Sequence, residues 1–141
     1  MSKESIEIAN KLNLSSVMNK TKWRELAIAL DSNREFTPVI RAKYIFDALP
    51  MPGFSFFDWE LLIQGESENI EWIEIDPIKR EYMGQLVPDK ETDFSKFIKN
   101  TLSQFNIPYS LENSFYKVWG YVNPDNQPNF ISLPVLRGNT V

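Results

Sequence analysis

Apolar and polar residues alternate in two neighbouring stretches near the middle of the chain. In residues 54–64, Asp58 and Glu60 have one parity, and four apolar side chains have the other: Phe57, Trp59, Leu61 and Ile63. A polar turn over residues 65–68 leads to residues 70–75, where the alternation resumes. Because successive side chains of a strand point to opposite faces, the pattern predicts an antiparallel hairpin with one apolar face and one acidic face.

The acidic face of this predicted hairpin supplies most of the candidate binding residues. The sequence from Asp58 to Asp76 contains acidic side chains and no basic one. Trp72 and Glu74 share the parity of the acids on the first strand, and a slip by one residue would bury charge. The candidate partner-binding residues in this region are Asp58, Glu60, Glu71, Trp72, Glu74 and Asp76.

Three interpretations of the acidic cluster stay open. In the first, the acids pair internally: bases on a neighbouring strand over residues 39–45 would face Asp58 and Glu60, and Lys117 would face Glu74. In the second, the face is exposed and binds a cationic partner. In the third, it holds a divalent metal or a pair of catalytic carboxylates, although no spacing matches a calcium loop or a nucleotide–metal motif.

Two other segments have apolar residues at helical spacing. The first predicts a helix over Lys20–Leu30 that begins at Asn19 or Thr21, with a stripe formed by Trp23, Leu26, Ala27 and Leu30. The second predicts a helix over Asp93–Gln104 that begins at Thr92 or Asp93. Its apolar stripe contains Phe94, Phe97, Ile98, Leu102 and Phe105.

Further strands are predicted over residues 37–46 and 114–122, and a short edge strand over residues 130–133. Residues 77–91 are interrupted by Gly84 and Pro88, so we expect an irregular connection there, with at most a turn of helix or a short strand.

Together these elements predict an α+β fold. We expect a single domain with an antiparallel sheet of about four to five strands, on which the helices Lys20–Leu30 and Asp93–Gln104 pack. This domain would span residues 19–133. An N-terminal arm or short helix over residues 1–18 would precede it, and a tail over residues 134–141 would follow.

Composition narrows the possible chemistry. The chain has 141 residues, a net charge of -4, no histidine and no cysteine. Histidine is the commonest general base near neutral pH and a common metal ligand, and cysteine supplies a thiol nucleophile or a thiolate ligand. Because the chain has neither residue, we expect no cofactor and no enzyme activity. The net negative charge disfavours nucleic acid as a partner. No apolar run is long enough to span a membrane, so we expect a cytoplasmic protein.

Three phrases in the sequence form an ordered set. They are NKTKW at residues 19–23, IEWIEI at residues 70–75, and IPY at residues 107–109 followed by VWGY at residues 118–121. In this order and spacing they resemble a family of small bacterial proteins classed as domain of unknown function 6678. The resemblance covers about residues 19–122. It implies a small intracellular bacterial protein and supplies no catalytic residues.

These observations favour a non-enzymatic protein-binding module of the immunity or inhibitor type, with a basic protein as its partner. Trp119 and Tyr121 share one strand face and complete the set of candidate partner-binding residues. The alternatives are a small-molecule or peptide binder in which Trp72, Trp119 and Tyr121 form an apolar wall, and an enzyme that uses neither histidine nor cysteine. A homodimer joined through the N-terminal segment or an edge strand is compatible with each.

Overall fold

A central antiparallel sheet organises the molecule. The computed structural model describes residues 3–131, and within them this sheet has four strands in the order β2-β3-β7-β6. Their bounds are β2 Ile40–Tyr44, β3 Ile70–Ile75, β7 Phe115–Trp119 and β6 Tyr109–Glu112. Side chains of alternating parity point to one face, where Ala42, Ile73 and Val118 are fully buried. This face forms the floor of the main core.

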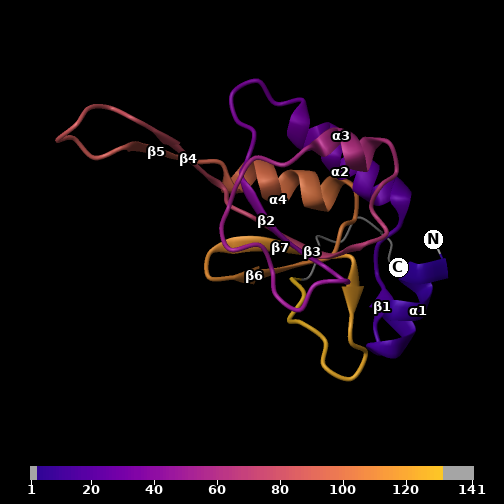
Figure 1. Cartoon of the computed structure of the whole chain (residues 1–141). Coiled ribbons are helices and arrows are strands. Elements are labelled where there is room, and N and C mark those ends of the chain that lie inside the picture. The colour runs from indigo at the N-terminus through magenta and orange to yellow at the C-terminus, as the bar shows by residue number, and fades with distance from the viewer. Residues whose placement is uncertain (1–2, 132–141) are drawn as a thin grey trace.

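Three helices cover that face of the sheet: α2 (Lys20–Asp31), α3 (Trp59–Ile63) and α4 (Ser95–Gln104) (Figure 1). The two helices predicted from apolar spacing are confirmed, as is the α+β class. Asn19 caps α2, where its side-chain oxygen accepts a hydrogen bond of 2.8 Å from the Lys22 amide. Leu26 and Leu30 of α2 pack with Ile98 and Leu102 of α4 against the sheet.

The predicted hairpin over residues 54–75 is wrong, because its first half is not a strand. Residues 59–63 form α3, and Asp58 is the N-cap whose carboxylate accepts a hydrogen bond from the Glu60 amide. Trp59 and Leu62 are buried, at helical spacing, whereas Leu61 is exposed. Over so few residues, the same sequence fits both the two-residue period of a strand and the 3.6-residue period of a helix. The capping Asp58 favours the helix. As a result β3 pairs with β2 and β7 instead.

Residues 77–91 contain strands where an irregular connection was predicted. Strand β4 (Ile78–Glu81) pairs antiparallel with β5 (Lys90–Asp93) and forms a ribbon that projects from the body (Figure 1). We call residues 78–93 the arm, strands β4 and β5 its shaft, and residues 82–89 its tip. Alternation of apolar and polar residues was absent here because the shaft buries neither face, so the pattern gave no strand signal.

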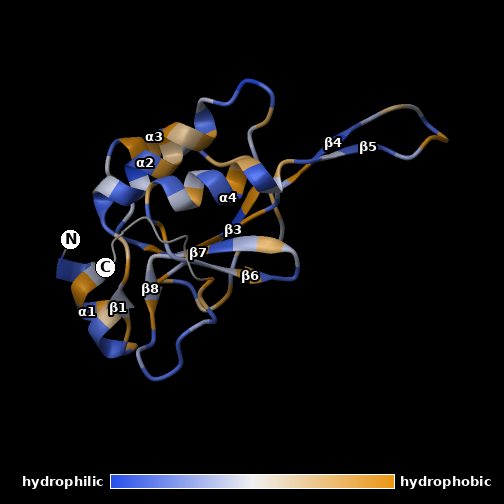
Figure 2. Ribbon diagram, turned by 180° about the vertical axis from the view of Figure 1, so that it is seen from behind, coloured by the Kyte–Doolittle hydropathy of each residue, from blue (hydrophilic) through white to orange (hydrophobic). Residues whose placement is uncertain are grey.

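The N-terminal segment is docked on the edge of the sheet. Helix α1 (Lys3–Lys11) is followed by β1 (Ser15–Ser16), which pairs with β8 (Tyr121–Val122). Ala9 of α1 packs with Ile45 and Tyr121 in a second, smaller apolar cluster. Figure 2 shows α1 and β1 beside β8, apart from the helices α2, α3 and α4. At the other end, Phe130 makes an isolated bridge to Ser110. The next residue, Ile131, donates its amide to the carbonyl of Tyr109 at 2.8 Å. Residues 132–133 of the edge strand predicted over residues 130–133, and the tail predicted over residues 134–141, lie outside the described residues.

Candidate functional site

The acidic residues predicted from the sequence do not form one exposed face. Asp58 and Glu60 lie on α3, whereas Glu71 and Glu74 lie on β3. Glu74 and Asp76 are buried, with exposed fractions of 4% and 6%. The expectation of an open acidic surface on this sheet is therefore wrong, because strand register places bases directly beside these acids.

Each buried or half-buried acid of β3 has a basic partner. The Arg41 Nε donates to Glu74 Oε1 at 2.8 Å, and the Lys43 Nζ donates to Glu71 Oε1 at 2.6 Å. Beyond the strand, Arg80 Nη1 donates to Asp76 Oδ2 at 2.8 Å. Internal pairing thus describes this cluster, but with other partners than predicted: Arg41 and Lys43 face the acids of β3 and not those of α3.

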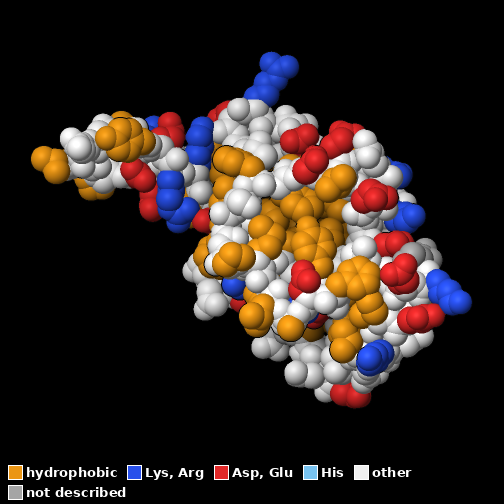
Figure 3. Space-filling model, viewed as in Figure 1, with side chains coloured by type: hydrophobic (Ala, Val, Ile, Leu, Met, Phe, Trp, Pro, Cys, Tyr) orange, Lys and Arg blue, Asp and Glu red, His pale blue; other side chains and the backbone are white. Residues whose placement is uncertain are grey.

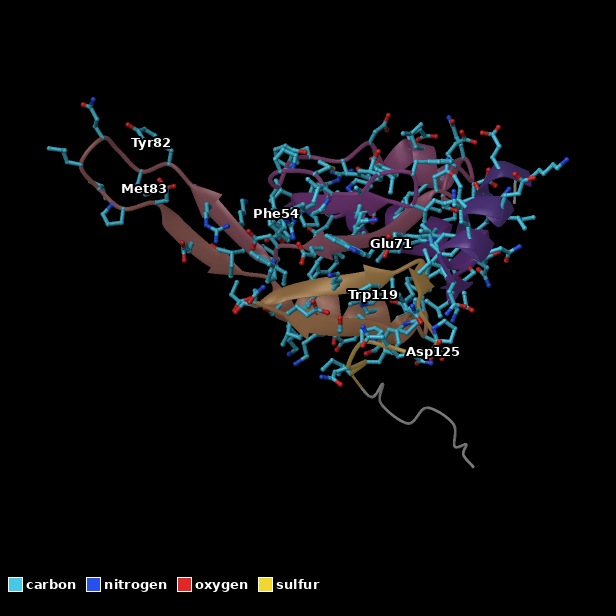
Figure 4. The ribbon with its side chains drawn as sticks, turned by 60° about the horizontal axis from the view of Figure 1, so that its bottom comes forward. Phe54, Glu71, Tyr82, Met83, Trp119 and Asp125 are labelled. Atoms are coloured by element: carbon cyan, nitrogen blue, oxygen red, sulfur yellow. The ribbon has the colours of Figure 1, made fainter. Side chains whose placement is uncertain are left out.

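Aromatic side chains and a buried lysine complete this face of the sheet. Lys117 is opposite Glu74 in the strand register, as predicted. Its Nζ lies 3.9 Å from the ring centroid of Trp72 and 4.5 Å from that of Trp119, which are cation–π distances. The indole nitrogen of Trp119 donates to Ser110 Oγ at 3.0 Å. Trp72 and Trp119 are thus engaged in contacts within the fold, and Figure 4 shows Trp119 among side chains of the body.

Tyr121, the remaining predicted candidate, lies at a different place. Its ring packs on the N-terminal segment, and its hydroxyl donates a hydrogen bond to the backbone carbonyl of Glu68. Burial, and then the nearby charge of Glu68, raise the pKa of Tyr121. The three aromatic residues Trp72, Trp119 and Tyr121 therefore do not form the single apolar wall that the sequence suggested.

A small recess lies beside Tyr121. It has a volume of about 200 Å³ and brings together the start of α2 with the β7–β8 junction. Its lining includes Met18, Lys20, Trp23, Gly120 and Tyr121. Ligand pockets that enclose drug-sized molecules usually have about 300–1,000 Å³, so this recess suits only a small group.

Four exposed apolar side chains gather at the tip of the arm, a site that the sequence did not reveal. Leu86 is 97% exposed and Tyr82 is 75% exposed, and Met83 and Val87 are also exposed. The shaft between the tip and the body is charged (Figure 3), with Lys79, Arg80 and Glu81 on β4 and Lys90, Glu91 and Asp93 on β5. In Figure 4 the labelled Tyr82 and Met83 lie at the far end of the arm from the body.

A second hollow lies where the arm leaves the body. We call it the basal groove; it has a volume of about 410 Å³ and an apolar lining of Phe36, Val39, Phe56 and Ile78. Its charged lining consists of Arg34, Lys79 and Arg80 with Glu35. The Phe36 ring is fixed by stacking on Phe94, with centroids 4.4 Å apart. Phe56 is 75% exposed, so the groove is open to a partner.

Residues 3–131 contain no metal-binding cluster, because no group of three or more acidic side chains lies close enough together to hold an ion. In the same residues, no helix is both long and apolar enough to cross a bilayer. Two apolar features stand out on the surface of the described residues: the tip of the arm and the basal groove.

Comparison with known proteins gives one match. No curated protein and no solved structure matches the chain. A family model described as "Family of unknown function (DUF6678)" matches residues 5–125, which is most of the sequence. This match includes all three phrases that suggested the resemblance, the docked N-terminal helix from residue 5, and the arm. The chain therefore belongs to this family of unknown function.

Proposed function

We propose that the protein is a non-enzymatic protein-binding module whose contact element is the tip of the arm. The observation that carries the proposal is the position of the apolar residues. Tyr82, Met83, Leu86 and Val87 are exposed at the end of a charged ribbon, away from both apolar clusters of the fold. Grouped exposed apolar side chains of this kind mark interaction surfaces.

The tip does not stabilise the chain that carries it. A two-stranded hairpin without a packed face is only marginally stable in water, and an exposed leucine gains nothing from the hydrophobic effect. Burial against a partner would contribute roughly 1.5–3 kcal/mol for each fully covered Leu, Met or Val side chain. These residues therefore contribute favourable free energy only when a partner covers them.

The partner class follows from the same surface. An apolar tip requires an apolar recess on the partner, lined by side chains that can surround Leu86 and Tyr82. The immunity or inhibitor role with a basic partner rests on the net charge of -4, which would speed the encounter with a positively charged protein. The acids of β3 do not contribute to this attraction, because their charges are compensated by Arg41 and Lys43 within the fold.

The absence of histidine and cysteine from the sequence supports a role without catalysis. Acid–base chemistry would have to use carboxylates, lysines or tyrosines, and Glu74 and Asp76 are held in ion pairs with Arg41 and Arg80. Both carboxylates are thereby engaged in contacts within the fold.

A photo-crosslinking experiment tests the proposal. The photoreactive amino acid p-benzoylphenylalanine replaces Tyr82 at the tip, or Lys96, an exposed residue of α4, as the control position. We expect Tyr82 to give a discrete crosslinked species in cells that the Lys96 position does not give. The crosslinked protein is then purified, and its affinity is measured with wild-type chain and with Leu86→Asp, which should bind at least about tenfold more weakly. Equal crosslinking from both positions, or equal affinity of both chains, would contradict the proposal.

A second candidate function is binding of a small molecule in the recess beside Tyr121, which is favoured by its apolar lining of Met18, Trp23 and Tyr121. In a thermal-shift screen, a ligand of this recess should raise the melting temperature of the wild type. Ser16→Trp, which places a ring in the recess from its exposed rim, should abolish that rise. A ligand whose effect survives Ser16→Trp binds elsewhere.

A further inference from the structure

We propose that a small hollow between α4 and the β6–β7 edge of the sheet binds the carboxylate of a small organic acid. The hollow has a volume of about 180 Å³ and is lined by Lys99 of α4, by Tyr109, Leu111 and Tyr116 of the sheet, and by Ile131. Figure 1 shows α4 lying over these strands. None of these residues belongs to the arm, so the inference goes beyond the proposed function and does not depend on it.

Two buried phenol groups line this hollow. Tyr109 and Tyr116 are diagonal neighbours on one face of β6 and β7, since Tyr109 is opposite Val118 and Tyr116 is opposite Leu111. Their rings meet edge to face, with centroids 5.7 Å apart. Each tyrosine is only 5% exposed. Neither hydroxyl has a hydrogen-bond partner within residues 3–131, and neither oxygen is completely enclosed.

Unpartnered hydroxyls at a hollow point to a ligand that supplies the missing partner. Buried polar groups of folded proteins nearly always form a hydrogen bond, and here two of them leave this capacity unused at the same place. Both are available as donors at neutral pH. Burial, and then the nearby phenol of Tyr116, raise the pKa of Tyr109 above its ordinary value of 10.0, so its proton is retained.

The charge beside the two phenols selects an anion. Lys99 is exposed and forms no ion pair within the part of the chain that the structure describes. None of the described lining residues is acidic, and α4 carries Lys96 and Lys99 but no acid. Glu112, the acid of β6, has the other parity and contacts Lys117 on the opposite face of the sheet. An ammonium and two phenols thus border one hollow, where an oxyanion would accept charge-assisted hydrogen bonds.

Size and charge narrow the ligand to a monoanion with a short apolar body. One ammonium lines the hollow, so a carboxylate is matched in charge, whereas a phosphate group would carry nearly twice that charge at neutral pH. Leu111 and Ile131 supply the apolar part of the lining. The volume lies below the roughly 300–1,000 Å³ of sites for drug-sized molecules, so it suits a branched aliphatic acid of a few carbons.

Titration with isovalerate, followed through the amide chemical shifts of the whole chain by NMR, tests this site. Saturable shifts should appear in α4, β6 and β7 at millimolar concentration, and isovaleramide, the uncharged isostere, should give none. Lys99→Gln should weaken isovalerate binding about tenfold or more, because the cation is lost. The matched control Lys96→Gln removes a charge from the same helix outside the lining and should bind as the wild type does.

A double variant tests the phenols without disturbing their packing. Tyr109→Phe combined with Tyr116→Phe keeps both rings, so it should weaken isovalerate binding about tenfold while leaving the melting temperature of the free protein unchanged or higher. The site is overturned by an absence of saturable shifts, by equal binding of isovaleramide, or by variants that bind as the wild type does. Tighter binding of inorganic phosphate than of isovalerate would refute the carboxylate. None of these results bears on the tip of the arm, which is tested separately by crosslinking from Tyr82.

Discussion

At Gly120 the backbones of two chain segments approach each other closely. It joins β7 to β8, and its amide donates a hydrogen bond of 2.7 Å to the carbonyl of Glu71. A Cβ atom at this position would lie 2.2 Å from the carbonyl oxygen of Ile70. We predict that Gly120→Ala lowers the free energy of unfolding by roughly 2–3 kcal/mol, because backbone and not a flexible side chain must move. Urea denaturation at neutral pH measures this change.

Gly53 provides the matched control for that substitution. A Cβ atom there would have no heavy atom within 4 Å, so Gly53→Ala should change the free energy of unfolding by no more than about 0.5 kcal/mol. If Gly120→Ala is as stable as Gly53→Ala, the close approach of β8 to β3 is not a constraint on the fold.

The hydroxyl of Tyr121 gives a pH-dependent prediction. It donates to the carbonyl of Glu68, and burial raises its pKa above the ordinary value of 10.0. Tyr121→Phe should therefore lower stability by about 1 kcal/mol at neutral pH through the lost hydrogen bond. Because the folded pKa is the higher one, the stabilisation is complete below pH 10 and is lost as the pH rises through the folded pKa. Urea denaturation at increasing alkaline pH should show that the difference in free energy of unfolding between wild type and Tyr121→Phe becomes smaller. A difference that does not change with pH would contradict a raised pKa of Tyr121.

At the scale of elements, the sequence predicted those that bury one face over a long stretch. Helix α2 and helix α4 each present an apolar stripe over about three turns, and no other period fits them. In β3, the alternation of IEWIEI identified a strand, but not its neighbours, since pairing depends on residues far along the chain. Whether the acids of β3 pair internally or are exposed consequently stayed open from the sequence, and the register then places Arg41 opposite Glu74.

The proposed binding surface was the part that sequence patterns could not predict. The arm has no buried face, so its strands lack the apolar alternation by which strands are recognised. Gly84 and Pro88 suggested an irregular connection with at most a turn of helix or a short strand. The one available signal was the apolar group Tyr82-Met83 and Leu86-Val87 enclosed by charged residues, which is unusual for a surface loop. The groove needed the fold itself, since Phe36, Phe56 and Ile78 come from three separate segments.

The start of helix α4 depends on a side chain just outside it. Asp93 Oδ1 accepts a hydrogen bond of 2.7 Å from the Ser95 amide, and hydrogen bonds from Ser95 lower the pKa of Asp93 below 3.8. Since the folded pKa is the lower one, this stabilisation is present above the ordinary pKa and is lost as the pH falls through the folded pKa. We predict that Asp93→Ala lowers the urea midpoint at neutral pH and reduces the loss of stability on acidification.

Asp93→Asn separates the contribution of the hydrogen bond from that of the titrating carboxyl group at the start of α4. Asparagine keeps an acceptor for the Ser95 amide but does not titrate. Its urea midpoint at neutral pH should lie between those of wild type and Asp93→Ala, and its acid dependence should match that of Asp93→Ala. An acid dependence equal to that of the wild type would show that another carboxyl group is responsible.

On the scale of the whole molecule, residues 3–131 contain two apolar clusters of unequal size. The main core joins α2, α3 and α4 to the sheet, whereas the smaller cluster holds α1 through Ala9, Ile45 and Tyr121. Outside it, α1 is fixed by polar contacts such as the hydrogen bond of 2.6 Å from Ser5 Oγ to Asn69 Oδ1. Elements with few buried apolar contacts open at a lower free energy than the global core, so α1 and β1 should form a separate unit of local unfolding.

Ala9→Asp tests this division, because it places a charge in the smaller cluster alone. Ala9 is 6% exposed, and an unpaired buried carboxylate is strongly unfavourable. We predict that α1 detaches, so that hydrogen exchange monitored by mass spectrometry shows loss of protection in residues 3–16 while α2, α4 and β3 keep theirs. Ile6→Asp on the exposed side of the same helix should leave all protection unchanged. Uniform loss of protection in Ala9→Asp would mean that α1 and the main core unfold as one unit. It would also mean that the N-terminal helix, and not the sheet alone, holds β8 and Gly120 in position.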